Sequence, residues 1–259
     1  MTAPPIDLWN AETFDPALTA LLTANLDLIR AFVAEQKAID AEYEADQRRP
    51  MRRSNPHWDA LHALEQEIDA LARDRTARGW HYSRLTDDEV AVIRANGLTV
   101  STLAGLARRL NARVAAGDLT EAEAKAVYNA SPLHEQGDSR LDQICFAAKP
   151  QRPTSAGVRR LLSLYGGEAA SFHLEDSLLL ARLETLGRPR IVEAAIPLAT
   201  VRRSTPLGKA ILGAFAARHN VRLDEVMPDL FAKQDLGAGT ILAIHTEGEA
   251  RFTAFSEAD

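Results

Sequence analysis

The stretch from Gly79 to Leu98, GWHYSRLTDDEVAVIRANGL, constrains the fold of this chain more than any other. Its first aromatic residues favour a β-strand. Thr86 and Glu89 then have the spacing of a capping box, so a helix should begin directly after the strand. Asn96-Gly97 is a typical helix stop. The stretch therefore predicts a strand that leads straight into a capped helix and places a histidine near the junction.

Residues 1–78 have the pattern of two helices joined by a polar loop. Asp15 can cap a helix that Pro16 begins, and apolar residues recur at helical spacing over 16–46. A second helix is expected over 56–78, and together the two predict an antiparallel hairpin. The side chains expected to be buried in it are Leu22, Ile29, Phe32, Leu61 and Ile68. The apolar stripe of this hairpin needs a partner, which would be either the rest of the chain or a second copy in a homodimer.

Residues 79–259 alternate helical patterns with short apolar runs. Continuous apolar runs at 143–148, 190–196 and 240–245 predict three strands of one sheet with both faces covered. Further helices are expected over 101–116, 118–130, 154–164, 177–186 and 206–218, and further strands over 168–174 and 251–255. The chain thus predicts an α+β protein, with a helical N-terminal hairpin at 1–78 followed by a mixed sheet with flanking helices at 79–259.

Charge and composition exclude some classes of function. The net charge of −6 argues against a protein that binds nucleic acid through bulk positive charge. The loop QRRPMRRSNP holds four arginines, but acidic residues surround it, as in a solvated loop. A single cysteine forms no disulfide within the chain and fits a cytoplasmic location. We expect neither a membrane span nor a signal peptide, because the apolar runs are short and the N-terminus lacks a basic segment.

Two groups of polar residues early in the second half could form a site. His81 and Ser83 would share one face of the first strand, where they could hydrogen-bond a ligand's hydroxyl or amide. The same position also suits a buried histidine that donates to a backbone carbonyl. From Tyr165 to Glu168, paired glycines would let a ligand approach the backbone closely, or would simply end a helix and start a strand.

A third group follows the last predicted buried strand. His245 ends that strand, and Glu247 and Glu249 flank a glycine directly after it. Such groups are frequent in active sites and equally frequent in solvated turns. Combining these residues with His134 gives no recognised metal-ligand spacing, so we expect no metal. Cys145 lies in an apolar run and is expected to be a small core residue.

The segment WHYSRL followed by DDEVAVIRANGL resembles the ADP-ribosyltransferase superfamily. Members of that superfamily often open with a strand carrying His or Arg and continue into a helix with a glycine-leucine stop. The segment DQICFAAKP is similar to the family's second strand, and a later acidic residue completes the usual triad. The resemblance covers about residues 79–255. It implies a split sheet that grips NAD as a co-substrate and an unknown macromolecular acceptor.

The resemblance also implies roles for individual residues. The NAD-binding residues would be His81, Tyr82, Ser83, Tyr165 and Glu168. His81 would hydrogen-bond the adenosine-side ribose and the nicotinamide amide, and one of the two tyrosines would stack on the nicotinamide ring. Glu247 would be catalytic with His81, holding the ribose 2′-hydroxyl and stabilising an oxocarbenium-like transition state. Glu168 and Glu249 compete with it for this role.

The alternative is a non-enzymatic interaction or scaffold protein. In that case the helical hairpin would bind a protein partner or dimerise, and the second half would be a scaffold. The candidate residues His81, Glu168 and Glu247 would then not converge in space.

Overall fold

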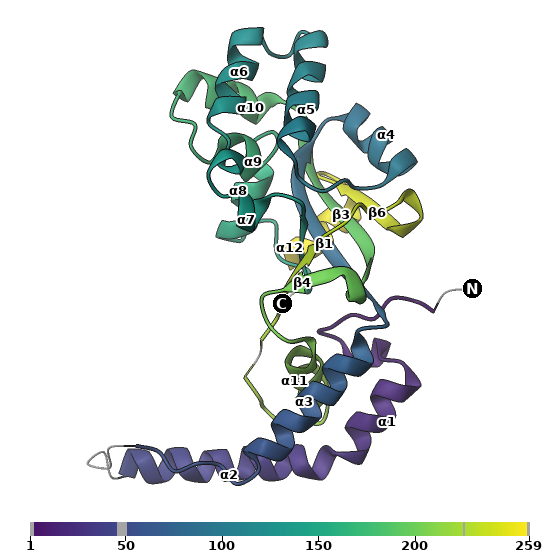
Figure 1. Ribbon diagram of the computed structural model, residues 1–259, viewed down its shortest axis with the longest axis vertical. Helices are drawn as coiled ribbons and strands as arrows, with labels where there is room; N and C mark the ends of the chain where they lie inside the picture. The colour runs from purple at the N-terminus through teal and green to yellow at the C-terminus, as the bar shows by residue number, and fades with distance from the viewer. Residues whose placement is uncertain (1–2, 46–50, 225, 258–259) are drawn as a thin grey trace. The chain divides into compact units, whose positions relative to one another are not determined.

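The structure is a computed structural model that describes residues 3–45, 51–224 and 226–257. It has an α+β fold with N-terminal helices and a six-stranded antiparallel sheet (Figure 1). The chain forms two compact units. The first contains residues 1–78, 197–199 and 203–229, and the second contains 79–196, 200–202 and 230–259. The end of the first predicted helix and most of the arginine-rich loop fall on 46–50, outside the described residues.

The N-terminal helical segment consists of two helices instead of the one that we predicted. Helix α1 spans Pro16–Ala24 and α2 spans Leu26–Ala45, with a bend of 51° between them. The bend falls at Asn25, whose Nδ2 donates to the carbonyl of Leu21 at 2.9 Å. Asparagine competes with the helix for backbone partners in this way, which explains why the helix breaks there. The cap at Asp15 is confirmed, because its carboxylate accepts from two backbone N–H groups of the first turn.

The third helix of this unit packs chiefly against a helix from much later in the sequence. Helix α3 spans Trp58–Ala72 and stops before the predicted end near 78, because a strand begins at Thr76. Helix α11, Leu207–Arg218, lies along it. The contact is so close that a Cβ on Gly208 would lie 1.9 Å from the carbonyl oxygen of Glu65. The five residues predicted to be buried in the hairpin are all buried.

The sheet joins six strands in the order β4-β5-β2-β1-β3-β6. The strands are β1 Thr76–Leu85, β2 Ile144–Ala147, β3 Arg188–Pro197, β4 Val201–Arg203, β5 Asp229–Ala232 and β6 Ile241–Thr246. The three strands predicted from apolar runs are therefore confirmed as members of one sheet. The prediction that both faces are covered is wrong for β6, an edge strand on which Leu242 is 43% exposed.

Helices gather at one end of the sheet in the second unit (Figure 1). They are α5 Leu103–Ala115, α6 Glu121–Asn129, α7 Gly137–Arg140, α8 Ala156–Ser163, α9 Glu168–Ser171 and α10 Ser177–Thr185, while α4 Asp87–Asn96 and α12 Ala250–Glu257 contact β6. The predicted helices around α5, α6, α8 and α10 are confirmed. Leucines of α5 and α10 form a common core with Val127 and Tyr165.

Two predicted strands are helices, and one core prediction is wrong. The run at 168–174 forms α9, and the run at 251–255 forms α12, whose Phe252 and Phe255 are buried. Short apolar alternation fits a single helical face as well as a strand, so the pattern could not separate them. Cys145 is exposed, because the alternation of β2 turns it away from buried Ile144 and Phe146.

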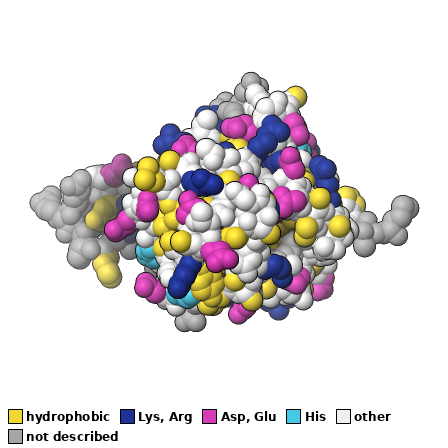
Figure 2. Space-filling view, turned by 90° about the horizontal axis from the view of Figure 1, so that it is seen from above, with side chains coloured by type: hydrophobic (Ala, Val, Ile, Leu, Met, Phe, Trp, Pro, Cys, Tyr) yellow, Lys and Arg dark blue, Asp and Glu magenta, His cyan; other side chains and the backbone are white. Residues whose placement is uncertain are grey.

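No single helix in the described ranges is long and apolar enough to cross a membrane. The bent pair α1 and α2 reaches the necessary length and apolar composition only when the two helices are counted together. Basic and acidic side chains are interspersed on the face shown in Figure 2, and neither sign forms a continuous patch there. This face therefore offers no broad basic surface of the kind that follows a nucleic-acid backbone.

Candidate functional site

The predicted strand-to-helix junction is confirmed. Strand β1 ends at Leu85, and Thr86 caps α4. The capping box is present, and in one half of it the Thr86 backbone N–H donates to Glu89 Oε2 at 2.9 Å. The Thr86 hydroxyl also donates to the same oxygen at 3.1 Å. The helix ends at Gly97, which has φ of +90°. Local sequence alone therefore places Glu89 beside the end of the central strand.

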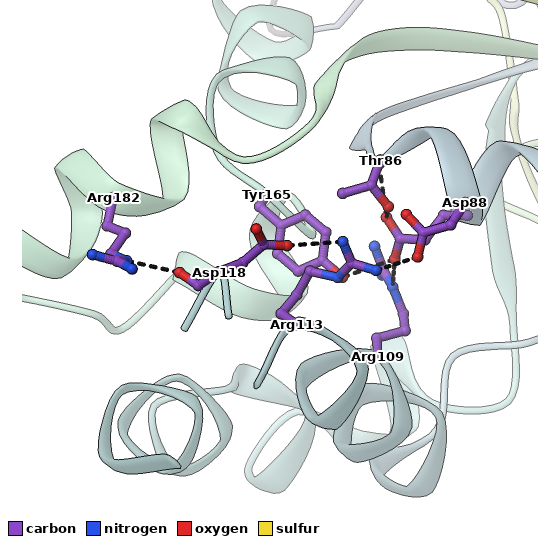
Figure 3. Close-up of polar contacts among 8 residues, drawn as sticks. Thr86, Asp88, Arg109, Arg113, Asp118, Tyr165 and Arg182 are labelled. Atoms are coloured by element: carbon purple, nitrogen blue, oxygen red, sulfur yellow. Dashed lines mark hydrogen bonds and ion pairs between the residues drawn. The ribbon is translucent and has the colours of Figure 1, made fainter. Parts of the chain in front are cut away.

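The second oxygen of Glu89 accepts hydrogen bonds from two residues that are distant in sequence, Arg109 and Tyr165. Both are labelled in Figure 3. Arg109 Nε on α5 donates to Glu89 Oε1 at 2.6 Å, and the hydroxyl of Tyr165 donates to the same oxygen at 2.8 Å. The Arg109 guanidinium also lies 5.2 Å from the centre of the Tyr165 ring. We call Thr86, Glu89, Arg109 and Tyr165 the Glu89 cluster. It ties α4, α5 and the segment before α9 to the end of β1.

Burial and charge set the protonation states of the cluster. Burial alone would raise the pKa of Glu89, but the Arg109 charge and the hydrogen bonds outweigh it, so this pKa lies below its usual value. The pKa of Arg109 is raised, because the effect of burial is exceeded by that of the Glu89 carboxylate. The pKa of Tyr165 is raised, mainly by burial. At neutral pH the cluster is therefore an ion pair with a protonated tyrosine.

A second set of charged residues continues from this cluster along α5. The Arg113 side chain is 6% exposed and bridges Asp88 and Asp118, with Nη1 3.0 Å from Asp118 Oδ2. The carbonyl of Asp118 in turn accepts from Arg182 Nε at 2.8 Å (Figure 3). A depression of about 470 Å³ lies beside Arg182 and Asp118. Its other lining residues are Gly117, Glu123, Leu178, Thr185 and Leu186.

His81 lies close enough to the Glu89 cluster to be affected by its charge. Nδ1 of His81 is 2.9 Å from the carbonyl oxygen of Cys145, and since a carbonyl only accepts, Nδ1 carries the hydrogen. Burial lowers the pKa of His81, and the Arg109 charge lowers it further. The ring meets Phe146 edge-on, with centroids 5.8 Å apart. His81 is therefore a neutral imidazole with a fixed tautomer, whose Nε2 is a hydrogen-bond acceptor.

The structure fixes the surroundings of Tyr82 and Ser83. Tyr82 is buried, accepts from the backbone N–H of Gln151 at 2.7 Å, and has its pKa raised to about 12, chiefly by burial. Ser83 is also buried. Of the residues predicted to bind a ligand, His81 and Tyr165 share a neighbour in Arg109.

The three competing carboxylates have different environments. Glu168 is bound by Arg140 at 2.9 Å and lies 3.8 Å from Arg160. Glu249 accepts from the backbone N–H of Thr246 at 2.9 Å, which lowers its pKa. Glu247 is exposed in the turn after β6, and among the described residues its carboxylate has no hydrogen bond or ion pair. Glu247 is thus the candidate whose carboxylate is available to a ligand.

The sheet places His81 and Glu247 on strands that are not direct neighbours. The backbone N–H of Glu247 donates to the carbonyl of Pro189. The charge of Glu247 also acts on Arg84 of β1, where it opposes the lowering of the Arg84 pKa by burial. Arg84 and His81 are three residues apart on β1, or roughly 10 Å, and β6 lies two strands from β1, again roughly 10 Å. The two backbones are then on the order of 14 Å apart, so a ligand that touches both side chains must be extended.

His245 belongs to a separate buried pair. Its Nε2 lies 3.0 Å from Glu193 Oε2, and both side chains are about 90% buried or more. Its ring packs 5.4 Å from Phe255 of α12. Within the described part of the chain, no group of three or more His, Cys, Asp or Glu side chains could hold a metal ion. The sequence offered no signal for the Arg109 and Tyr165 partners of Glu89, because they lie 20 and 76 positions away.

Comparison of the chain with protein-family models, with curated proteins and with solved structures found no match.

Proposed function

We propose that this chain uses NAD as a co-substrate and transfers ADP-ribose to a macromolecular acceptor, on an ADP-ribosyltransferase-like sheet. The observation that carries the proposal is the state of His81. Its Nδ1–H is committed to the Cys145 carbonyl, and its lowered pKa keeps Nε2 unprotonated on a half-buried ring. An acceptor of this kind suits an N–H of the nicotinamide amide or a ribose hydroxyl.

Arg109 supports the proposal from the neighbouring helix. Its Nε is bound to Glu89, while its Nη2 is buried and has no hydrogen-bond partner among the described residues. An unpaired buried N–H is costly, so an oxygen acceptor that reached this position would be bound favourably. Phosphate and amide oxygens of NAD are acceptors of the type that arginine binds. Tyr82 and Tyr165 are 5% and 1% exposed, so stacking of either ring on nicotinamide would require a local rearrangement.

Glu247 is the proposed catalytic carboxylate. When NAD is bound, the bond between ribose C1′ and the nicotinamide nitrogen would break with its electron pair leaving on nicotinamide, and an O–H or N–H group of the acceptor would bond to C1′ and release its proton to solvent. A carboxylate near the ribose stabilises the positive charge that develops at C1′. Glu247 suits this role because its carboxylate is unpaired among the described residues, whereas those of Glu168 and Glu249 are engaged.

The proposal is tested by titrating NAD into the full chain in a calorimeter and by measuring nicotinamide release in the presence of cell lysate. We expect His81→Ala to weaken NAD binding about tenfold, because one buried hydrogen bond is lost. Glu247→Gln should abolish release and keep binding, while Glu249→Gln, two residues away, should keep both. NAD binding by the wild type should persist below pH 6.5, because the pKa of His81 is lowered from that value. Absence of both binding and release at millimolar NAD would refute the proposal.

Two observations favour the alternative of an interaction or scaffold protein. The backbones of His81 and Glu247 are on the order of 14 Å apart, so the two residues do not converge closely. The second observation is the exposure of large apolar side chains. Trp58, at the start of α3, is 59% exposed, and Met51 is 80% exposed. Large apolar side chains at the surface are frequent in protein interfaces. Under this alternative the chain would dimerise or bind a partner through the N-terminal helices. Light scattering of Trp58→Ala against the wild type would then show a loss of self-association, with NAD having no effect.

A further inference from the structure

We infer that Arg202, Lys233 and Gln143 form a binding site for a phosphate group of a small ligand. The three residues come from consecutive strands at one side of the sheet. Arg202 is in β4, Lys233 follows β5, and Gln143 precedes β2. This inference is independent of the proposed use of NAD.

The carbonyl oxygen of the Gln143 side chain brings the two cations together. Arg202 Nη2 donates to it at 3.1 Å and Lys233 Nζ donates to it at 3.2 Å. The two nitrogens therefore lie no more than 6.3 Å apart, the sum of these distances. Gln143 is 1% exposed, and its own amide nitrogen donates to the carbonyl of Ser139. Its orientation is thus fixed, with the oxygen facing the cations.

The two cations lack a negative partner. Among the described residues, neither Arg202 nor Lys233 forms an ion pair with a carboxylate. The nearest acidic residue along the chain from Lys233 is Asp235, whose carboxylate instead accepts from the backbone N–H of Val100 at 2.8 Å. A neutral amide does not cancel two positive charges, so the pair repel each other unless an anion binds between them.

The chemistry of the pair selects the anion. The Arg202 guanidinium stacks on the Phe231 ring, with 4.5 Å to the centroid, which fixes its plane. A planar guanidinium with free N–H groups next to a lysine ammonium matches the several oxygens and double charge of a phosphate. Both cations are exposed, so a phosphate group could reach them from solvent.

The test is a calorimetric titration of the full chain with inorganic phosphate, ADP and NAD, each at matched ionic strength. We expect saturable binding of phosphate that weakens about tenfold in Arg202→Gln and in Lys233→Gln, since each removes one charged donor. The control is Arg251→Gln, which removes another exposed arginine stacked on a phenylalanine, at 5.2 Å from the Phe255 centroid. Among the described residues, Arg251 shares no hydrogen-bond acceptor with a second cation. Circular dichroism of each variant checks that it is folded.

Comparing the three ligands distinguishes inorganic phosphate from the phosphate of a nucleotide. Weakened binding of all three ligands in both variants supports a general phosphate site. Weakening confined to ADP and NAD supports a nucleotide phosphate. The inference is overturned if no ligand binds saturably, or if both variants bind all three as the wild type and Arg251→Gln do. The test does not measure nicotinamide release. The phosphate site can therefore be confirmed or refuted even if the transferase proposal fails.

Discussion

Replacing Glu89 with alanine should strongly destabilise the second unit. The carboxylate of Glu89 accepts four hydrogen bonds, two from Thr86 and one each from Arg109 and Tyr165. Removing it leaves the Arg109 charge without its ion pair and the buried Tyr165 hydroxyl without an acceptor. It also removes half of the capping box at the start of α4.

The expected loss follows from these three contributions. Breaking the ion pair should cost about 2 kcal/mol, less than for a fully buried pair because the Arg109 side chain is 32% exposed. The unsatisfied Tyr165 hydroxyl should cost about 1–2 kcal/mol, and the lost cap about 1 kcal/mol. Neighbouring contributions are not additive, so we expect a total of about 3–4 kcal/mol in the free energy of unfolding.

Hydrogen-exchange mass spectrometry of peptides from α4 and α5 measures the free energy of opening in the two helices that the Glu89 cluster joins. The matched control is Glu123→Ala, because Glu123 forms the same capping box with Thr120. Its side chain is more exposed, at 28% against 15% for Glu89, its arginine partner Arg182 is 3.8 Å away, and no tyrosine among the described residues donates to it. The control should accelerate exchange far less than Glu89→Ala. Equal effects of the two substitutions would refute the reasoning, since the capping box alone would then explain both.

The same carboxylate predicts a dependence of stability on pH. The pKa of Glu89 is lowered in the folded state, so its stabilisation is present above the unfolded value of about 4.3 and is lost as the pH falls through the folded value. Glu89→Gln should remove this part of the acid dependence. An acid unfolding curve with the same slope as the wild type would contradict the assignment.

Three further predictions concern packing. Gly208→Ala should destabilise the first unit by about 2 kcal/mol or more in a urea melt, because the new Cβ would collide with the backbone of Glu65 in α3. Gly213→Ala on the same helix should be close to neutral, because its nearest neighbour is 3.8 Å away. Ile191→Asp should abolish cooperative thermal unfolding of the second unit, since it buries an unpaired charge at a fully buried position; a cooperative melt would contradict this. Deleting residues 1–78 should cause aggregation in light scattering, because α11 loses α3, and a soluble, folded monomer would show otherwise.

Local signals accounted for most of the secondary structure. The capping box at Thr86 and the Asp15 cap mark helix starts that the structure confirms. Apolar runs located β2, β3 and β6 because a buried strand must be apolar over several residues. Strands β4 and β5 were missed because they are short and lie outside any continuous apolar run: β4 carries two arginines, and β5 begins with Asp229.

Long-range contacts could not be predicted from the sequence. The packing of α11 on α3 joins segments more than 130 positions apart, and only the three-dimensional fit at Gly208 reveals it. The Glu89 cluster depends on Arg109 and Tyr165, which reach one carboxylate from different segments. The sequence allowed either a ligand-binding His81 or a histidine that donates to a backbone carbonyl. The structure shows the second contact, to the carbonyl of Cys145 on another strand.

The measurement that most directly tests the central claim uses NAD labelled separately in its adenine and nicotinamide parts, incubated with the wild type and cell lysate. We predict that the adenine label enters macromolecules and that nicotinamide is released in equal amount, and that both are lost in Glu247→Gln but not in Glu249→Gln. Incorporation of neither label into macromolecules, with no release of nicotinamide by the wild type at millimolar NAD, would contradict the claim.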